Sequence, residues 1–188
     1  MILPIVSYGT KVLKQKAQDI SSDYPNLERL IEDMFETMYE ASGVGLAAPQ
    51  IGRSIRLFIV DGSPFANENP EMNGFRKVFI NPKIIEESGE EWSFNEGCLS
   101  IPSIREDVSR LSKIRIYYQD QDFNTIEEEF DGTKARIIQH EYDHIEGILF
   151  TDYLSTFKKR LLKRKLNDIT KGNVNVDYRM KFPLKKGR

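Results

Sequence analysis

The stretch QHEYDHIEG, residues 139 to 147, contains both histidines of the chain, His140 and His144, with Glu141 between them. The apolar residues around it recur at helical spacing, and Gly147 is a typical helix end. On a helix, side chains four residues apart project from one face, so the two imidazoles can hold one divalent metal ion. Glu141 then lies where its carboxylate can reach a water on that metal. The alternative is a pair of ordinary core or surface histidines, but the spacing favours the metal site.

A catalytic metal site of this kind needs a third protein ligand and an open position. No histidine follows His144, and Glu146 is too close along the helix to turn back to the same metal. The chain's only cysteine, Cys98, lies upstream in NEGCLSIPS. A free cysteine is most often a small buried hydrophobe, yet beside a metal helix its thiolate is a strong candidate ligand. The predicted ligands are therefore Cys98, His140, His144 and one water.

Hydroxide attack on a carbonyl builds negative charge on oxygen, which requires donors that are already in place. The segment GVGLAAPQ, residues 43 to 50, offers Gly43 and Gly45, where backbone can approach a ligand closely, and the amide NH2 group of Gln50. Taken alone, glycines after a helix usually form only a cap and a turn. The segment is a candidate oxyanion site when it is read together with the metal motif.

The order of predicted elements is helix, many strands, helix, helix. We predict an amphipathic helix at 25–41, a buried strand at 55–62, a loop at 63–75, two short strands within 77–103, a hairpin at 113–132, a helix at 133–150 and a basic helix at 155–169 capped by Ser155. This order favours an α+β fold with mostly antiparallel sheets packed around a central metal-binding helix, and with a C-terminal helix.

The chain has 188 residues, which fits one domain, and it contains no apolar run long enough to span a membrane. A single cysteine fits a reducing cytosol. Residues 156–188 carry 12 Lys/Arg and two acidic residues, a net charge of +10, while the remainder, with 15 basic and 27 acidic residues, carries −12. We predict a catalytic region at 1–155 and a basic helix and tail at 156–188 of the same domain. The basic end suggests an anionic partner, although a solvated helix is an equally good interpretation.

GVGLAAPQ, EGCLS and QHEYDHIEG, in that order, resemble the three signature motifs of peptide deformylases. The opening ILPIVSYGTKVLKQKA also resembles the N-terminal segment of that family, and the resemblance extends from about residue 2 to residue 155. It implies a cytoplasmic bacterial enzyme that removes the formyl group from formyl-methionyl nascent peptides and releases formate. It also implies that the basic C-terminal helix can contact ribosomal RNA.

The resemblance implies roles for particular residues. Cys98, His140 and His144 would bind one divalent metal, Fe(II) physiologically, with Zn, Ni or Co possible in isolated protein. Metal-bound water would be the nucleophile, Glu141 the general acid/base, and the Gln50 side chain and the Leu99 backbone N–H the oxyanion donors. The residues implied in substrate binding are Val44, Gly45, Gly97, Arg105 and Ile137.

Three segments depart from a simple match. Arg136 stands where many relatives carry an apolar residue that lines the methionine pocket. The loop at 63–75 and the tail after Asn173 vary in the family, so no role carries over to them. Two other functions are open from the residues: a zinc peptidase that acts on ordinary peptide bonds, which requires a downstream ligand, and a non-enzymatic metal-binding or ribosome-binding protein, in which Glu141 and Gln50 have no role.

Overall fold

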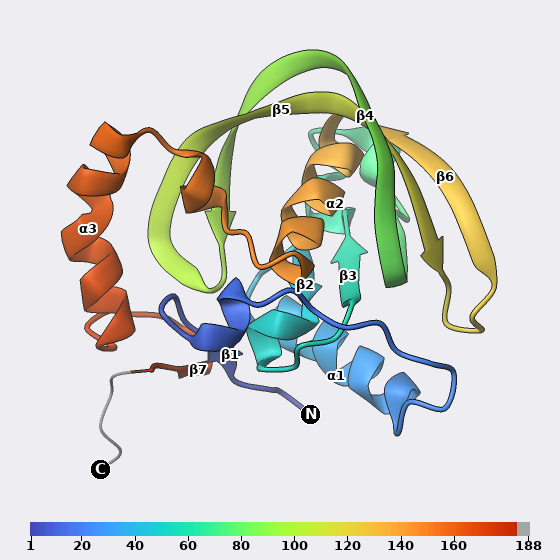
Figure 1. Cartoon of the computed structure of the whole chain (residues 1–188), viewed down its shortest axis with the longest axis horizontal. Coiled ribbons are helices and arrows are strands. Elements are labelled where there is room, and N and C mark those ends of the chain that lie inside the picture. The colour runs from blue at the N-terminus through green and yellow to red at the C-terminus, as the bar shows by residue number, and fades with distance from the viewer. Residues whose placement is uncertain (184–188) are drawn as a thin grey trace.

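Five strands between the first and last helices form one antiparallel sheet with the strand order β2-β3-β4-β5-β6 (Figure 1). The computed structural model describes residues 1–183. The strands of this sheet are β2 (Gly45–Ala47), β3 (Leu57–Asp61), β4 (Arg76–Cys98), β5 (Ile101–Gln119) and β6 (Thr125–Asp131). The helices are α1 (Leu27–Glu40), α2 (Gly132–Ile145) and α3 (Thr156–Thr170). Two short strands, β1 (Ile5–Val6) and β7 (Met180–Lys181), pair in parallel.

Strand β3 is buried along its whole length because helices cover both faces of the sheet at this point. Leu57 and Ile59 pack into the apolar cluster that contains the buried side of α1, whereas Phe58 and Val60 pack into the cluster that contains α2. Successive residues of a strand point to opposite faces, so a strand covered on both sides reads as an unbroken apolar run. The run at 55–62 predicted this strand correctly.

The hairpin of β4 and β5 is much longer than the two short strands predicted within 77–103. The 23 residues of β4 pair with the 19 residues of β5, and the hairpin curves over α2 (Figure 1). Pro82 and Gly89, which read as turn signals, lie at register shifts of the ladder instead. Bulges at such residues bend a strand without ending it, which is why the prediction of two separate strands was wrong.

All three predicted helices form, although α2 ends at Ile145 and not at residue 150. Helix α1 begins two residues after Pro25, and α2 ends just before Gly147, whose φ of 75° is the left-handed conformation of a helix-terminating glycine. The hydroxyl of Ser155 accepts a hydrogen bond from the Lys158 backbone N–H at 3.3 Å and caps α3. The predicted α+β architecture with a helix surrounded by antiparallel sheet is confirmed, and the predicted hairpin forms between β5 and β6.

Helix α3 packs against the first part of β5 through Leu162, Leu166 and Ile169. No helix within residues 1–183 combines the length and the apolar character that crossing a membrane requires. The division of the chain at residue 155 stays a prediction. Residues 184–188, which belong to the predicted basic end, lie outside the described residues.

Candidate active site

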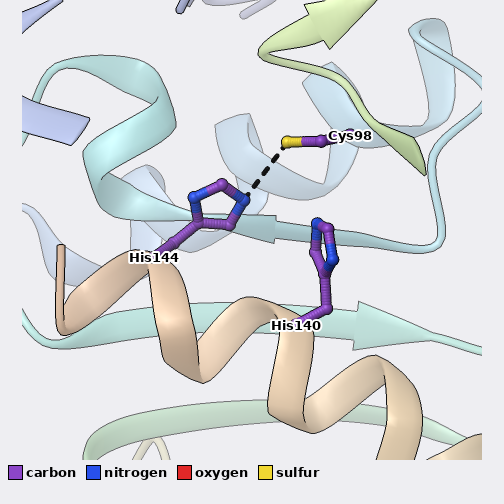
Figure 2. Close-up of side chains that lie close together, drawn as sticks. All are labelled: Cys98, His140 and His144. Carbon is purple, nitrogen blue, oxygen red and sulfur yellow. Dashed lines mark hydrogen bonds between the residues drawn. The ribbon is translucent and has the colours of Figure 1, made fainter. Parts of the chain in front are cut away.

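Three potential metal ligands meet where the end of β4 faces α2. His140 and His144 project from one side of α2 toward Cys98, the last residue of β4 (Figure 2). The Sγ atom of Cys98 lies 3.3 Å from Nε2 of His144, and one ligand atom from each of the three residues lies within 4.8 Å of the others. Two imidazoles and a thiol at this spacing are a donor set that suits zinc and other divalent transition metals.

The hydrogen bond between His140 and Glu96 orients the His140 ring for metal binding. Its Nδ1 lies 2.9 Å from Oε2 of Glu96, which leaves Nε2 for a metal, as in the carboxylate–histidine pairs that accompany metal ligands. Burial lowers the pKa of His144 well below its usual value, so its ring is neutral. Burial also opposes a charge on His140, but Cys98 and Glu96 outweigh it and raise the pKa of that ring well above its usual value. Neighbours that stabilise a positive charge on His140 also favour a bound metal ion. Cys98, His140 and His144 therefore fit a divalent metal.

Glu96 is the centre of a buried ionic network. Its carboxylate accepts hydrogen bonds from Arg110 Nε at 2.7 Å, from Arg110 Nη2 at 3.0 Å and from Arg136 Nη1 at 2.9 Å. Burial raises the pKa of Glu96, but hydrogen bonds from His140 and Arg110 more than offset this and hold it well below the usual range. Arg110 also donates to Asp143 at 2.7 Å, so the network ties β4 and β5 to both turns of α2 that carry the histidines.

Glu141 is buried beside the histidines, and its Oε2 atom has no hydrogen-bond partner among the described residues. Burial, with smaller contributions from nearby charges, raises the pKa of Glu141 to about 7. The backbone of β2 passes so close that a Cβ atom on Gly45 would collide with this carboxylate. Only glycine, which has no side chain, allows the β2 backbone to come this close to the Glu141 carboxylate.

Gln50 presents its amide to the metal-ligand cluster in a fixed orientation. Its Oε1 accepts the Ala47 backbone N–H at 2.8 Å, so its NH2 group must point the other way. That nitrogen lies 3.5 Å from Sγ of Cys98 and 3.3 Å from Oγ of Ser100. The orientation gives the site a buried, pre-positioned donor next to the thiol.

One cavity of about 570 Å³ connects these groups. Of the catalytic, ligand and substrate-binding residues predicted from the sequence, all except His144 line it: Val44, Gly45, Gln50, Gly97, Cys98, Leu99, Arg105, Ile137, His140 and Glu141. His144 lies behind the cavity wall and reaches the cluster through Nε2. The arrangement combines a metal-ligand cluster, a buried carboxylate and an amide donor around one opening, which suits metal-assisted hydrolysis of a carbonyl compound.

Arg136 lines the cavity, but its charged end is turned away into the protein. Its guanidinium donates to the backbone oxygens of Trp92 and Val108 at 2.6 and 2.7 Å, and it stacks 4.6 Å from the ring of Trp92. Arg136 therefore presents its aliphatic stem to the cavity, while its charged end is anchored in the interior. The sequence analysis did not identify the structural roles of Glu96 and Arg110. The one available signal was the position of Glu96, two residues before Cys98.

The chain is similar in sequence to known proteins along its whole length. The family model of polypeptide deformylase matches residues 2–160. The peptide deformylase of Christiangramia forsetii is 58% identical over 196 aligned positions that cover 100% of both chains, and that of Salinibacter ruber is 48% identical over 95% of this chain and 93% of its own. The chain belongs to the polypeptide deformylase family.

Solved deformylase structures have the same fold. The crystal structure of a peptide deformylase from Legionella pneumophila has a TM-score of 0.79 at 37% identity and covers 92% of this chain and 98% of that one. Peptide deformylase 1B of Arabidopsis thaliana, solved with an inhibitor, also has a TM-score of 0.79, at 33% identity, and covers 91% of this chain and 92% of that one. As a deformylase, the chain is an enzyme that removes N-formyl groups and depends on a metal.

We predict that Gly45→Ala lowers kcat/KM by about a hundredfold while the protein keeps its bound metal. The added methyl group displaces the Glu141 carboxylate, and a misplacement of about 1 Å costs a rate factor of this order. The measurements are formate release and metal content. The wild-type enzyme, loaded with the same metal and measured in parallel, is the reference. An unchanged kcat/KM in Gly45→Ala would contradict the close approach.

Proposed function

We propose that this cavity hydrolyses the formyl amide of formyl-methionyl nascent peptides, with Cys98, His140 and His144 as metal ligands and Glu141 as general acid/base. The observation that carries the proposal is the convergence of the ligand cluster, the buried carboxylate and the Gln50 amide on one opening. When bound, a divalent metal would act as a Lewis acid that acidifies water and polarises the formyl oxygen.

The proton transfers fall to Glu141. Its carboxylate accepts a proton from the water whose oxygen joins the formyl carbon, and then returns it to the amide nitrogen as the C–N bond breaks. The products are formate and a free peptide N-terminus. The burial of Glu141 keeps solvent from competing for this proton, and the nearby Gly45 backbone limits how far the carboxyl can move.

Two donors would stabilise the oxygen that becomes negative. The Gln50 NH2 group is held next to Cys98 by the bond between Oε1 and the Ala47 N–H. The Leu99 backbone N–H belongs to the two-residue turn that follows Cys98. Donors that are fixed before the reaction stabilise developing charge without reorganisation.

The remaining cavity walls would select the substrate. Val44, Gly45 and Gly97 line the cavity, where their backbone would lie beside an extended peptide, and Ile137 would contribute apolar surface for the methionine side chain. Arg105 lies at the rim, where its Nε donates to Oδ1 of Asn95 at 2.9 Å. The narrow space between β2 and Glu141 would admit a formyl group, whereas a larger acyl group would clash with the protein.

Two substitutions separate metal binding from proton transfer. Glu141→Ala should keep the metal and lose formate release, by at least about a hundredfold, because it removes the general acid/base. Cys98→Ala should lose metal affinity as well as activity, because it removes a ligand. The substrates are a formyl-Met peptide and its unformylated twin. Full activity in either variant would overturn the assignment, and cleavage of the unformylated twin would indicate a peptidase instead.

We also propose that the physiological metal is Fe(II). Sulfur and imidazole ligands accept several divalent metals, and both a thiolate and Fe(II) react with oxygen. Activity of the iron-loaded enzyme should therefore decay in air while that of the nickel-loaded enzyme persists. The measurement follows formate release and metal content of both forms during exposure to air. Equal persistence of the two forms would contradict the proposal.

Ribosome contact through α3 and a cytoplasmic location complete the proposal. The outer face of α3 leaves Phe157 and Leu161 exposed at 69% and 64%, one turn apart, and Arg160 and Arg164 are exposed as well. Basic side chains beside an exposed aromatic ring suit contact with ribosomal RNA. The free thiol of Cys98 and the nascent-peptide substrate both fit the cytoplasm.

The double variant Arg160→Glu/Arg164→Glu should weaken co-sedimentation with ribosomes and reduce its salt dependence, because each arginine lost removes a phosphate contact. Lys11→Glu/Arg53→Glu changes the net charge equally on exposed residues elsewhere and should leave binding unchanged. Hydrolysis of a free formyl-Met peptide should be the same in both variants. Equal ribosome binding by both variants would contradict the role of α3.

A further inference from the structure

The segment after α3 returns to the active site. Residues 173–181, here called the C-terminal strap, run with bends at Val174 and at Asp177 and Tyr178 to β7, which pairs in parallel with β1 near the N-terminus (Figure 1). The backbone N–H of Ile5 donates to Arg179 O at 2.9 Å, and that of Ser7 donates to Lys181 O at 3.0 Å. These bonds fix the end of the strap to the body of the protein.

Burial along the strap alternates as in a half-buried strand. Val174, Val176, Tyr178 and Met180 are partly buried, while the odd-numbered residues between them are exposed. Tyr178 and Met180 pack against the same apolar cluster as α1 and Leu99. The strap therefore has a defined inner face, although nothing in the sequence suggested a role for it.

The strap forms one wall of the catalytic cavity. Asn175, Val176, Asp177 and Tyr178 line the same 570 Å³ space as Cys98 and Glu141. The segment that bounds the cavity here is far in sequence from the EGCLS motif, since Tyr178 and Leu99 are separated by 79 residues.

Tyr178 binds the turn that connects β4 to β5. Its hydroxyl donates to the Leu99 carbonyl at 2.7 Å, and the Tyr8 backbone N–H donates to the Ser100 carbonyl at 2.8 Å. Both carbonyls of the turn are therefore held by the two terminal segments. The same turn carries Cys98 at its start and the Leu99 backbone N–H, so its position decides where a ligand and a donor lie.

We propose that Tyr178 is a positioning residue of the deformylase reaction, which it supports by holding the Leu99 carbonyl and thereby the position of the turn that carries the Leu99 N–H. The inference rests on the proposed function, in which this N–H stabilises the oxyanion. A donor is effective only at the position that the oxygen reaches in the transition state. If the turn moves, the Leu99 N–H no longer lies where it stabilises the oxyanion, while substrate binding in the rest of the cavity stays intact.

Tyr178→Phe keeps the ring and its packing and removes only the hydroxyl. In the metal-loaded full chain, kcat should fall about three- to tenfold, the range that corresponds to one hydrogen bond, while KM for a formyl-Met-Ala substrate stays the same. Amide hydrogen exchange of the peptide spanning 98–101 should become faster. Tyr24→Phe is the matched control, because Tyr24 packs against the same cluster with its hydroxyl near Arg53, away from the turn. It should match the wild type in all three measurements.

Wild-type kcat together with wild-type exchange in Tyr178→Phe would overturn the inference, and so would a rise in KM without a fall in kcat. Gln50→Ala, measured in the same series, tests the oxyanion assignment separately and should lose about a hundred- to a thousandfold in kcat. If Gln50→Ala loses this activity and Tyr178→Phe does not, the proposed function stands and the role of Tyr178 fails. If Gln50→Ala keeps full activity, the oxyanion assignment itself fails.

Discussion

The carboxylate of Glu96 is buried where β4, β5 and α2 meet, and it accepts hydrogen bonds from β5 through Arg110 and from α2 through Arg136 and His140. Removing one partner from a buried ionic group typically costs about 3–5 kcal/mol, because an unpaired charge stays in the interior. The curved hairpin therefore cannot move relative to α2 without breaking this network. Since Cys98 follows Glu96 by two residues and His140 bonds it directly, the same constraint sets the spacing of the metal-ligand cluster.

The site is assembled from segments that are far apart in the chain. The GVGLAAPQ segment brings the Gly45 backbone against Glu141 and the Gln50 amide against Cys98. Both terminal segments hold the turn after Cys98, through the Tyr8 N–H and the Tyr178 hydroxyl. The close approach of Gly45 restricts Glu141, and the hydrogen bonds restrict the turn after Cys98. Catalysis by pre-organised groups requires such limited freedom.

Local patterns predicted the helices well, and they singled out side chains that the structure brings together. The apolar periodicity of α1 and α3 and the stop at Gly147 are properties of short segments, and HExxH places two ligands by helix geometry alone. The length of β4 was not predictable in this way, because Pro82 and Gly89 end strands in most contexts and here lie at bulges.

Contacts between residues far apart in the chain could not be predicted from the sequence either. Arg136 reads as a charged residue in an apolar pocket until the carbonyls of Trp92 and Val108, which bind its guanidinium, are placed beside it. Tyr178 lies in a tail whose composition indicates no element, and only the pairing of β7 with β1 brings it to Leu99. Contacts of this kind depend on the topology of the whole chain rather than on spacing within a motif.

The most direct test of this account is the rate at which a chelator removes the metal from Glu96→Gln and from the wild type. Glutamine keeps the shape of the side chain but removes the charge that orients His140 and pairs with Arg110 and Arg136. We predict a protein that is still folded and loses its metal about 10–100 times faster, because removing a carboxylate that supports a metal-binding histidine usually weakens metal affinity by this factor. Glu86→Gln, which alters an exposed carboxylate paired with Arg115, should release metal at the wild-type rate. Equal rates for Glu96→Gln and the wild type would contradict the account.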